Sequence, residues 1–450
     1  MSELRIIGRH AGTVLVGQLA VMVFSITDTL VTGRYADSAL AALSVGSALY
    51  ISVYVTLLGV IQALLPVWAE LHGGRRQREV GRSVRQALYL CALGMALGMA
   101  VLLSPGPLLR WTQVPEALQA EVRAYLAVLA LALPPALLFR LYSTLNQSLG
   151  KPQLVTWLQI GSLGLKVPLS IWFTFGGGGL SAQGAVGCAW ATLVVNYAML
   201  GVALWLLRTQ DLYRPYGIWR RPEAPDWRHI ATLARLGLPG GLTLMVEVTS
   251  FTLMALFIAR LGTVASASHQ IASNLAAVLY MTPLSLAIGT SARVSYWLGA
   301  GQPQRARQVV GAGLLASTSL GLLAAGGLWL AREPVAALYA STPTVRLAAA
   351  ALLGWVALYH LADACQVMCV FILRCYRVTL GPLLVYSLLL WGVGLAGGYA
   401  LAYRGWASWP ALNTPAAFWA ASASALLSVA LILLFLLWRA LRAAPSHRSS

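Results

Sequence analysis

Apolar runs long enough to cross a membrane follow one another along almost the whole chain. Each of the twelve reaches the ~20 residues that a helix needs to span a bilayer. The chain is 59% hydrophobic and 10% charged, whereas soluble domains carry about 25% charged residues. The pattern predicts an all-α integral membrane protein with twelve transmembrane helices. The runs lie at residues 11–33, 41–67, 84–104, 124–148, 154–175, 184–207, 233–259, 266–290, 308–330, 347–373, 380–402 and 416–438.

The basic residues give the chain a formal net charge of +18. A charge of this size is also found in nucleic-acid-binding proteins, but here the arginines lie between apolar runs rather than on one polar domain. They concentrate in alternate connecting segments, which is the positive-inside bias of membrane proteins. We therefore expect no nucleic-acid partner, and we expect both termini and the long middle loop on the cytoplasmic side.

The two halves of the chain resemble each other. The longest polar interval, RTQDLYRPYGIWRRPEAPDWRH, separates six apolar runs from six others. AALSVGSALY corresponds to SASHQIASNL, and HGGRRQREVGR corresponds to LGAGQPQRARQ, both at an offset of about 226 residues. Because each half holds an even number of runs, both halves enter the membrane from the same side, which makes this a parallel repeat. We predict two pseudo-symmetric six-helix bundles, residues 1–221 and 222–450.

Three carboxylates lie deep inside the apolar runs: Asp28, Glu247 and Asp363. A carboxylate at the centre of a membrane helix costs ~2.5–3.5 kcal/mol on insertion scales, so it is rarely incidental. Two converging carboxylates in a low dielectric share a proton or hold a cation. We therefore predict a coupling site for Na⁺ or H⁺ at Glu247 and Asp363. In the alternative, each acid is protonated and only hydrogen-bonds neighbouring helices.

Asp28 shares its half of the chain with a deep lysine, Lys166. Only one other lysine, Lys151, is present in the whole sequence. A buried ammonium needs a partner or loses its proton, and Asp28 is the only deep acid in that half. We expect an Asp28–Lys166 pair. The alternative is that Lys166 extends its ammonium toward an interface.

Other side chains in the runs are secondary candidates. His269, Gln270 and Gln366 lie near the deep acids and either hydrogen-bond across helices or line a water-filled cavity. Tyr359 and Phe251 are candidates for contact with an aromatic cationic substrate. The chain contains no H-E-x-x-H, no G-x-S-x-G and no nucleotide-binding loop. We therefore expect no enzymatic activity and no cofactor other than the coupling ion.

These segments, in this order and spacing, resemble the multidrug and toxic compound extrusion family, in particular its bacterial NorM branch. The similarity implies a V-shaped transporter that exports drugs by alternating access in exchange for Na⁺ or H⁺. We expect its substrates to be amphipathic and often cationic, and we expect a monomer in the bacterial inner membrane. Glu247 and Asp363 match the acids of the second-bundle cation site, and Asp28 matches the first-bundle acid that the family uses in proton or substrate handling. The resemblance is carried by ITDTLVTGR, LGLPGGLTLMVEVTSF, SASHQIASN, MTPLSLAIGTSARVSYWLGAG and LADACQVMCVFILRCYR.

The sequence departs from the family pattern in its fifth run. Where NorM-like sequences have LNIPLN, this chain has LKVPLS, so that Lys166 and Ser170 replace two asparagines near the first-bundle acid. A tethered ammonium can take the place of an ion there, which leaves a first-bundle cation site open to question. Two alternative functions stay open: a lipid-linked oligosaccharide flippase of the same superfamily and, more remotely, an intramembrane enzyme.

Overall fold

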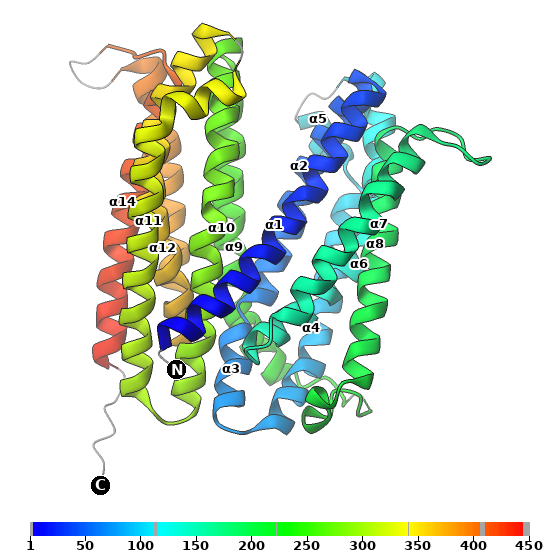
Figure 1. Cartoon of the computed structure of the whole chain (residues 1–450), viewed down its shortest axis with the longest axis vertical. Helices are drawn as coiled ribbons and strands as arrows, with labels where there is room; N and C mark the ends of the chain where they lie inside the picture. The colour runs from blue at the N-terminus through cyan, green and yellow to red at the C-terminus, as the bar shows by residue number, and fades with distance from the viewer. Residues whose placement is uncertain (1–2, 112–114, 222, 341, 406–409, 444–450) are drawn as a thin grey trace. The chain divides into compact units, whose positions relative to one another are not determined.

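The structure is a computed structural model that describes residues 3–111, 115–221, 223–340, 342–405 and 410–443 (Figure 1). Within these residues, twelve helical spans are long and apolar enough to cross a membrane, so the twelve predicted spans are confirmed. The elements are α1 (Glu3–Tyr35), α2 (Asp37–Gln62), α3 (Leu65–Gly73), α4 (Gln77–Leu103), α5 (Gly106–Trp111), α6 (Glu116–Ser148), α7 (Gln153–Phe175), α8 (Ala185–Thr209), the 3₁₀-helix η1 (Asp211–Tyr216), α9 (Trp227–Ala259), α10 (Thr263–Gly299), α11 (Pro303–Tyr339), α12 (Pro343–Cys375), α13 (Leu380–Tyr386), the π-helices η2 (Ser387–Gly397) and η3 (Ala400–Arg404), and α14 (Pro415–Ala443).

The helix order repeats along the chain. Helices α2 and α10 begin at Asp37 and Thr263, and α4 and α11 begin at Gln77 and Pro303. Both pairs of start points are 226 residues apart, the offset already seen between the matching sequence segments. The fourth spans of the two repeats, α6 and α12, are both 33 residues long. The structure therefore confirms the internal repeat.

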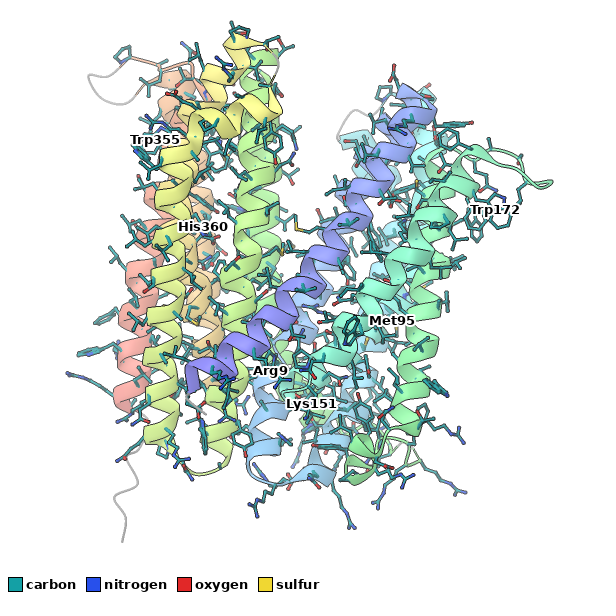
Figure 2. The ribbon with its side chains drawn as sticks, viewed as in Figure 1. Arg9, Met95, Lys151, Trp172, Trp355 and His360 are labelled. Carbon is teal, nitrogen blue, oxygen red and sulfur yellow. The ribbon has the colours of Figure 1, made fainter. Side chains whose placement is uncertain are left out.

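Helices α6 and α12 are the most buried spans, and each is surrounded by other helices. In α12, 83% of the most apolar stretch is buried, and in α6 67%, against 22–44% in the other ten spans. Helix α12 packs on α10, α11 and α14, and α6 packs on α2, α4 and α8. Buried polar residues of α12, such as His360 (labelled in Figure 2), therefore lie in the protein interior and not against lipid.

Packing divides the chain into two compact units. The N-terminal unit is Val16–Gly241, and the C-terminal unit is Leu242–Ser450 together with Met1–Leu15. The leading parts of α1 and α9 thus belong to a different unit from the rest of each helix, and the two points of change are again 226 residues apart. The predicted boundary between residues 221 and 222 touches Pro222, which lies outside the described residues, and it stays a prediction.

Specific contacts hold these two leading segments in place. At the start of α1, Glu3 accepts hydrogen bonds from Nε and Nη2 of Arg293 on α10, each 2.9 Å long, and one from Trp297 Nε1 at 3.2 Å. In α9, a Cβ added at Gly241 would lie only 2.5 Å from the carbonyl oxygen of Thr56 on α2. Glycine therefore permits a close helix–helix approach that no other residue allows.

Two of the predicted spans are not continuous α-helices. The second ends at Gln62 and restarts as α3 at Leu65, with Pro66 in the first turn. The eleventh begins as α13 and changes to the π-helix η2 at Ser387. π-Helical turns are rare and frequently lie at functional sites. In this chain the π-helical part contributes Leu390 to the candidate site.

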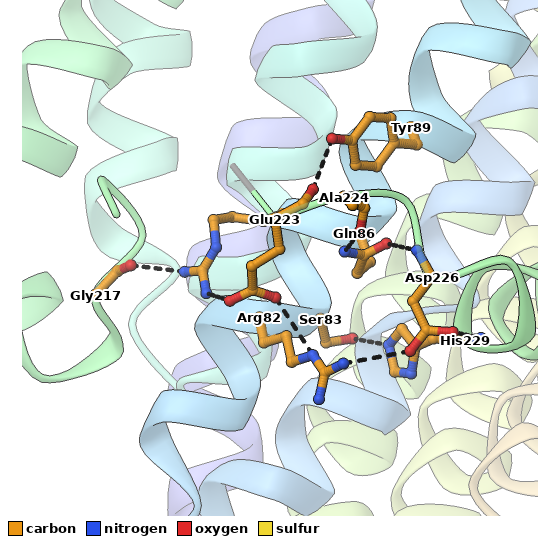
Figure 3. Close-up of polar contacts among 10 residues, drawn as sticks. Arg82, Ser83, Gln86, Tyr89, Gly217, Glu223, Ala224, Asp226 and His229 are labelled. Atoms are coloured by element: carbon orange, nitrogen blue, oxygen red, sulfur yellow. Dashed lines mark hydrogen bonds and ion pairs between the residues drawn. The ribbon is translucent and has the colours of Figure 1, made fainter. Parts of the chain in front are cut away.

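The middle loop is folded against α4 (Figure 3). Arg85 donates from Nη1 to the Gly217 carbonyl at 2.7 Å and from Nη2 to Glu223 Oε1 at 2.6 Å. Gln86 Oε1 accepts the backbone N–H of Asp226 at 2.8 Å. In the same loop, burial raises the pKa of Tyr216 to about 12, so its hydroxyl is neutral at physiological pH. The loop is therefore anchored by charged and backbone contacts.

Candidate cation site and a buried ion pair

A small cavity lies beside Glu247 inside the C-terminal unit. Its volume is about 10 Å³, close to the smallest space that holds one water molecule. The second half of α9 forms one wall, and single residues of α12, η2 and α14 form the others. A space of this size accepts one water molecule or one small cation, not a drug. The lining residues are Glu247, Ser250, Phe251, Met254, Tyr359, Leu390 and Ser422.

The polar groups of this cavity are mainly oxygen atoms. They belong to the carboxylate of Glu247 and to the hydroxyls of Ser250, Tyr359 and Ser422. Oxygen ligands suit hard cations, whereas transition metals favour nitrogen and sulfur ligands. Among the described residues, no group of three or more His, Cys, Asp or Glu side chains is arranged to hold a metal ion. The donor set therefore fits a monovalent cation or a proton.

Asp363 lies one helical turn beyond Tyr359 on α12 and is buried. It is not one of the cavity-lining residues, but its charge interacts with that of Glu247, as does the charge of the buried Arg374. Gln366 Nε2 donates a hydrogen bond to Asp363 Oδ1 at 2.8 Å. Two acids that interact in a low dielectric favour the uptake of a cation or a shared proton.

Three aromatic rings cluster beside the cavity. Phe251, Tyr359 and Trp419 contact one another edge to face, with centroid separations of 5.8 to 6.2 Å, the arrangement that aromatic pairs prefer. Trp419 Nε1 donates to Nδ1 of His269 at 3.2 Å. Of the two interpretations of His269, hydrogen bonding across helices is therefore the one that the structure supports. Because Phe251 and Tyr359 face a one-water space, their contact with a drug stays a prediction.

Gln270 does not join this group. It is exposed, and its Nε2 donates to Asn274 Oδ1, one turn further along the same helix, at 3.0 Å. Proximity in the sequence to His269 suggested a shared role, but successive residues of a helix point in different directions. Gln366 also bonds within its own helix, although its partner there is the deep acid Asp363.

The N-terminal unit contains a buried ion pair. Lys166 Nζ lies 2.7 Å from Asp28 Oδ1 and 2.9 Å from Oδ2, and the lysine is fully buried. The structure therefore brings together the two residues that the sequence predicted as partners, and Lys166 does not extend toward an interface. Ser170 Oγ donates to Asp28 Oδ1 at 3.0 Å, so both residues that depart from the family pattern contact this acid.

Neutral oxygens complete the surroundings of Lys166. Its ammonium donates to Thr192 Oγ1 at 2.7 Å and to the Cys188 carbonyl at 3.2 Å. Sequence reasoning missed these two groups, as it missed Ser250 and Ser422 beside Glu247. Serine and threonine are common in membrane helices, where their hydroxyls usually bond a carbonyl of the same helix. Their sequence positions therefore carried no signal.

The two sites are built on equivalent spans of the two repeats. Residues around Glu247 come from α9, η2 and α14, the first, fifth and sixth spans of the second repeat, with Tyr359 added from α12. Residues around Asp28 come from α1, α7 and α8, the first, fifth and sixth spans of the first repeat. In both repeats the deep acid lies in the second half of the first span.

Twelve spanning helices, an internal repeat, and buried charges within each unit define the chain as a multi-pass membrane protein with the organisation of a secondary transporter. Comparison with known proteins gives the family. The MatE family model matches residues 14–172 and 239–400, and the chain belongs to this family. Membership of the multidrug and toxic compound extrusion family, which the sequence predicted, is therefore confirmed.

Relatives match over nearly their full lengths. The chain is 39% identical over 428 residues to a "Probable multidrug resistance protein NorM" of Aromatoleum aromaticum, covering 94% of this chain and 91% of the relative. It is 33% identical over 444 residues to "Multidrug resistance protein PmpM" of Pseudomonas aeruginosa, with coverages of 98% and 92%. The NorM branch is therefore supported as well.

Solved structures show the same fold at low identity. The Vibrio cholerae MATE transporter VcmN in its bent form has a TM-score of 0.82 at 18% identity and covers 98% of both chains. The eukaryotic MATE transporter AtDTX14 has a TM-score of 0.86 at 16% identity, with coverages of 98% and 97%. The predicted fold class is confirmed by these likenesses.

Proposed function

We propose that the chain is a secondary active multidrug efflux antiporter that exports amphipathic and cationic organic compounds in exchange for Na⁺ or H⁺. It acts as a monomer in the bacterial inner membrane, surrounded by lipid, with both termini in the cytoplasm. The names of its relatives support drug export, since each of the two quoted above is named for multidrug resistance. They favour efflux over the flippase alternative.

One observation carries the coupling part of this proposal, the small oxygen-lined cavity beside Glu247. Its size excludes a drug and accepts one cation or one water molecule. Glu247 lines it, and a second deep acid, Asp363, interacts with the charge of Glu247. Uptake of a single Na⁺ or H⁺ therefore changes the net charge of the C-terminal unit, which is what coupling transport to an ion gradient requires.

The work available to such a site depends on the charge of the drug. Moving one elementary charge through a membrane potential of 100 mV releases ~2.3 kcal/mol. A free energy of 1.4 kcal/mol corresponds to about a tenfold concentration ratio, so one cation per cycle sustains a gradient of an uncharged drug well above tenfold. One-for-one exchange with a monovalent cationic drug moves no net charge, and there the concentration gradient of the ion drives export. Release of the ion restores the negative charge, and the site is then ready for the next cycle.

Glu247→Gln and Asp363→Asn should each abolish ion-driven export while leaving the protein folded, because the first removes the carboxylate that lines the cavity and the second removes the deep acid whose charge interacts with it. The measurement is export of a fluorescent organic cation from proteoliposomes, with Na⁺ and pH gradients imposed separately. Glu333→Gln, at an exposed position of α11, is the matched control and should export at the parental rate. Parental rates for both Glu247→Gln and Asp363→Asn would show that the coupling site lies elsewhere.

A further inference from the structure

We propose that Lys166 is a built-in cation of the N-terminal unit, held on the same three spans of the first repeat that, in the second repeat, line the cation cavity of the C-terminal unit. Only Glu247 and Asp363 then take up the coupling ion, and the site around Asp28 takes up none. This inference rests on the proposed function where it concerns the coupling ion. That the Lys166 ammonium fills the site beside Asp28 follows from its contacts and does not depend on the proposed function.

The contacts of Lys166 are those of a fully coordinated cation. An ammonium has three hydrogens to donate. Here they meet the Asp28 carboxylate at 2.7 Å, Thr192 Oγ1 at 2.7 Å and the Cys188 carbonyl at 3.2 Å. The lysine has no exposed surface. No donor of the ammonium is left over, so the oxygen shell around it is complete.

The two sites use the same spans of the two repeats but not the same positions, because at the offset of 226 residues Asp28 matches Met254 and not Glu247. The first, fifth and sixth spans of each repeat build both sites. In the C-terminal unit the fifth span contributes the apolar Leu390, and a one-water cavity stays between the helices. In the N-terminal unit the fifth span contributes Lys166, and its ammonium fills the space beside the acid. The same framework is thus used once with a space for an ion and once with a tethered one.

The charges of Asp28 and Lys166 also support a site that takes up no further cation. Asp28 and Lys166 neutralise each other, so a second cation at Asp28 would lie beside an ammonium and be repelled by it. If only the ammonium is removed, Asp28 is left as a buried carboxylate without a counter-charge, and such a group recruits a cation or a proton. The oxygens of Ser170, Thr192 and Cys188 stay in place around it. Removal of Lys166 should therefore create a new cation site.

The test is a gain of binding in a protein that lacks the first site. In the Glu247→Gln Asp363→Asn background, radioactive Na⁺ binding to the purified protein should be absent, and infrared spectroscopy should show no protonated Asp28. Adding Lys166→Met, which keeps an unbranched side chain one atom shorter and removes the ammonium, should produce about one Na⁺ site or one protonated carboxyl group per chain. Further addition of Asp28→Asn should remove that gain. The proposal is overturned if the Lys166→Met change adds neither a bound Na⁺ nor a protonated carboxyl group.

Lys151→Met is the matched control, because Lys151 is the only other lysine and lies exposed in the turn between α6 and α7 (Figure 2). It should produce no gain. A failure of the proposed function is recognised separately: ion-driven export that persists in the Glu247→Gln Asp363→Asn protein contradicts the coupling site. That outcome leaves the gain of a cation at Asp28 unaffected.

A second measurement needs no change at Lys166. Because the chain has two lysines, selective ¹⁵N labelling of lysine in a Lys151→Arg protein leaves a single side-chain nitrogen signal, that of Lys166. We expect the spectrum of a protonated, solvent-protected ammonium that saturating Na⁺ does not shift. A neutral amine, or an ammonium signal that moves when Na⁺ is added, would show that the lysine does not fill the site.

Discussion

Asp28 and Lys166 are stabilising only as a pair. A buried salt bridge gains little over an apolar pair of similar size, but removal of one partner leaves an unpaired buried charge, which costs about 3–5 kcal/mol. Thr192 and the Cys188 carbonyl satisfy the hydrogens of the ammonium, yet neither carries a negative charge. Removal of one charge therefore destabilises the N-terminal unit, whereas removal of both charges has a much smaller effect.

Asp28→Asn should lower the free energy of unfolding by about 3–5 kcal/mol, whereas the double change Asp28→Asn Lys166→Met should recover most of this loss. The reason is that the double variant leaves no unpaired charge in the interior. The measurement is reversible unfolding in mixed detergent micelles. Asp37→Asn, at the exposed start of α2, is the control and should have a small effect. If the separate effects of Asp28→Asn and Lys166→Met on the free energy of unfolding simply add in the double variant, the two residues are not coupled and the prediction is wrong.

At the residue scale, the sequence could predict the charges but, apart from Ser170 and Gln366, not their neutral partners. A carboxylate or ammonium in an apolar run is visible because its burial is costly, and this identified Glu247, Asp363, Asp28 and Lys166. A serine or threonine carries no such signal. Thr249 Oγ1, for instance, donates to the Met245 carbonyl of its own helix, while its neighbour Ser250 lines the cavity. Only the rotation of α9 about its axis, set by packing, separates the two.

At the scale of helices, hydropathy could predict how many spans exist and roughly where they lie, but not their hydrogen-bond pattern. It measures how apolar a run is, and α-helical and π-helical turns of the same residues are equally apolar. The change to the π-helix at Ser387 and the interruption of the second span after Gln62 were therefore not predictable from it. Helix ends also extended into polar segments, as α9 does by beginning at Trp227.

The contact between the middle loop and α4 is an element whose strength can be measured. Arg85 is 7% exposed in its side chain and binds both Gly217 and Glu223. Arg85→Ala should lower the free energy of unfolding by about 1–3 kcal/mol, because charged hydrogen bonds are lost from a buried group. The Glu223 side chain is 42% exposed, so solvent screening keeps the effect in the lower part of that range.

Arg214→Ala is the matched control for Arg85→Ala. It removes an ion pair with Asp211 whose side chains are 78% and 82% exposed, and exposed pairs contribute little. Thermal unfolding and limited proteolysis of the middle loop should therefore distinguish the two variants, with faster cleavage in Arg85→Ala alone. Equal cleavage rates would indicate that the loop is not held by Arg85.

At the scale of the whole molecule, the distribution of arginines predicts which segments face the cytoplasm. A cysteine replacing Trp219, which is 55% exposed, should resist an impermeant thiol reagent added to intact cells and react after permeabilisation. Gly217 is a poor site for the label, because its φ of 58° favours glycine. Leu180→Cys, in the loop between α7 and α8, is the control expected to react from outside. All variants are made in a background without the five native cysteines.

Labelling of residue 219 from outside intact cells, at the rate seen for residue 180, would reverse the predicted topology. The repeat and the number of spans could be predicted at this scale, since both depend on patterns along the chain. The division of α1 and of α9 between the two units could not be predicted, because hydropathy does not show which helices pack together. In this chain, that depends on pairs such as Glu3 with Arg293.

That exchange of leading segments has a consequence for the ancestry of the chain. Neither repeat by itself encodes a whole unit, since each unit borrows the opening turns of one helix from the other repeat. Two separate six-helix chains that swapped these turns would form a closed, two-fold dimer. A fusion of the two genes, joined by a segment such as the middle loop, would preserve the swap unchanged. The chain therefore has the connectivity of a domain-swapped dimer joined into one polypeptide.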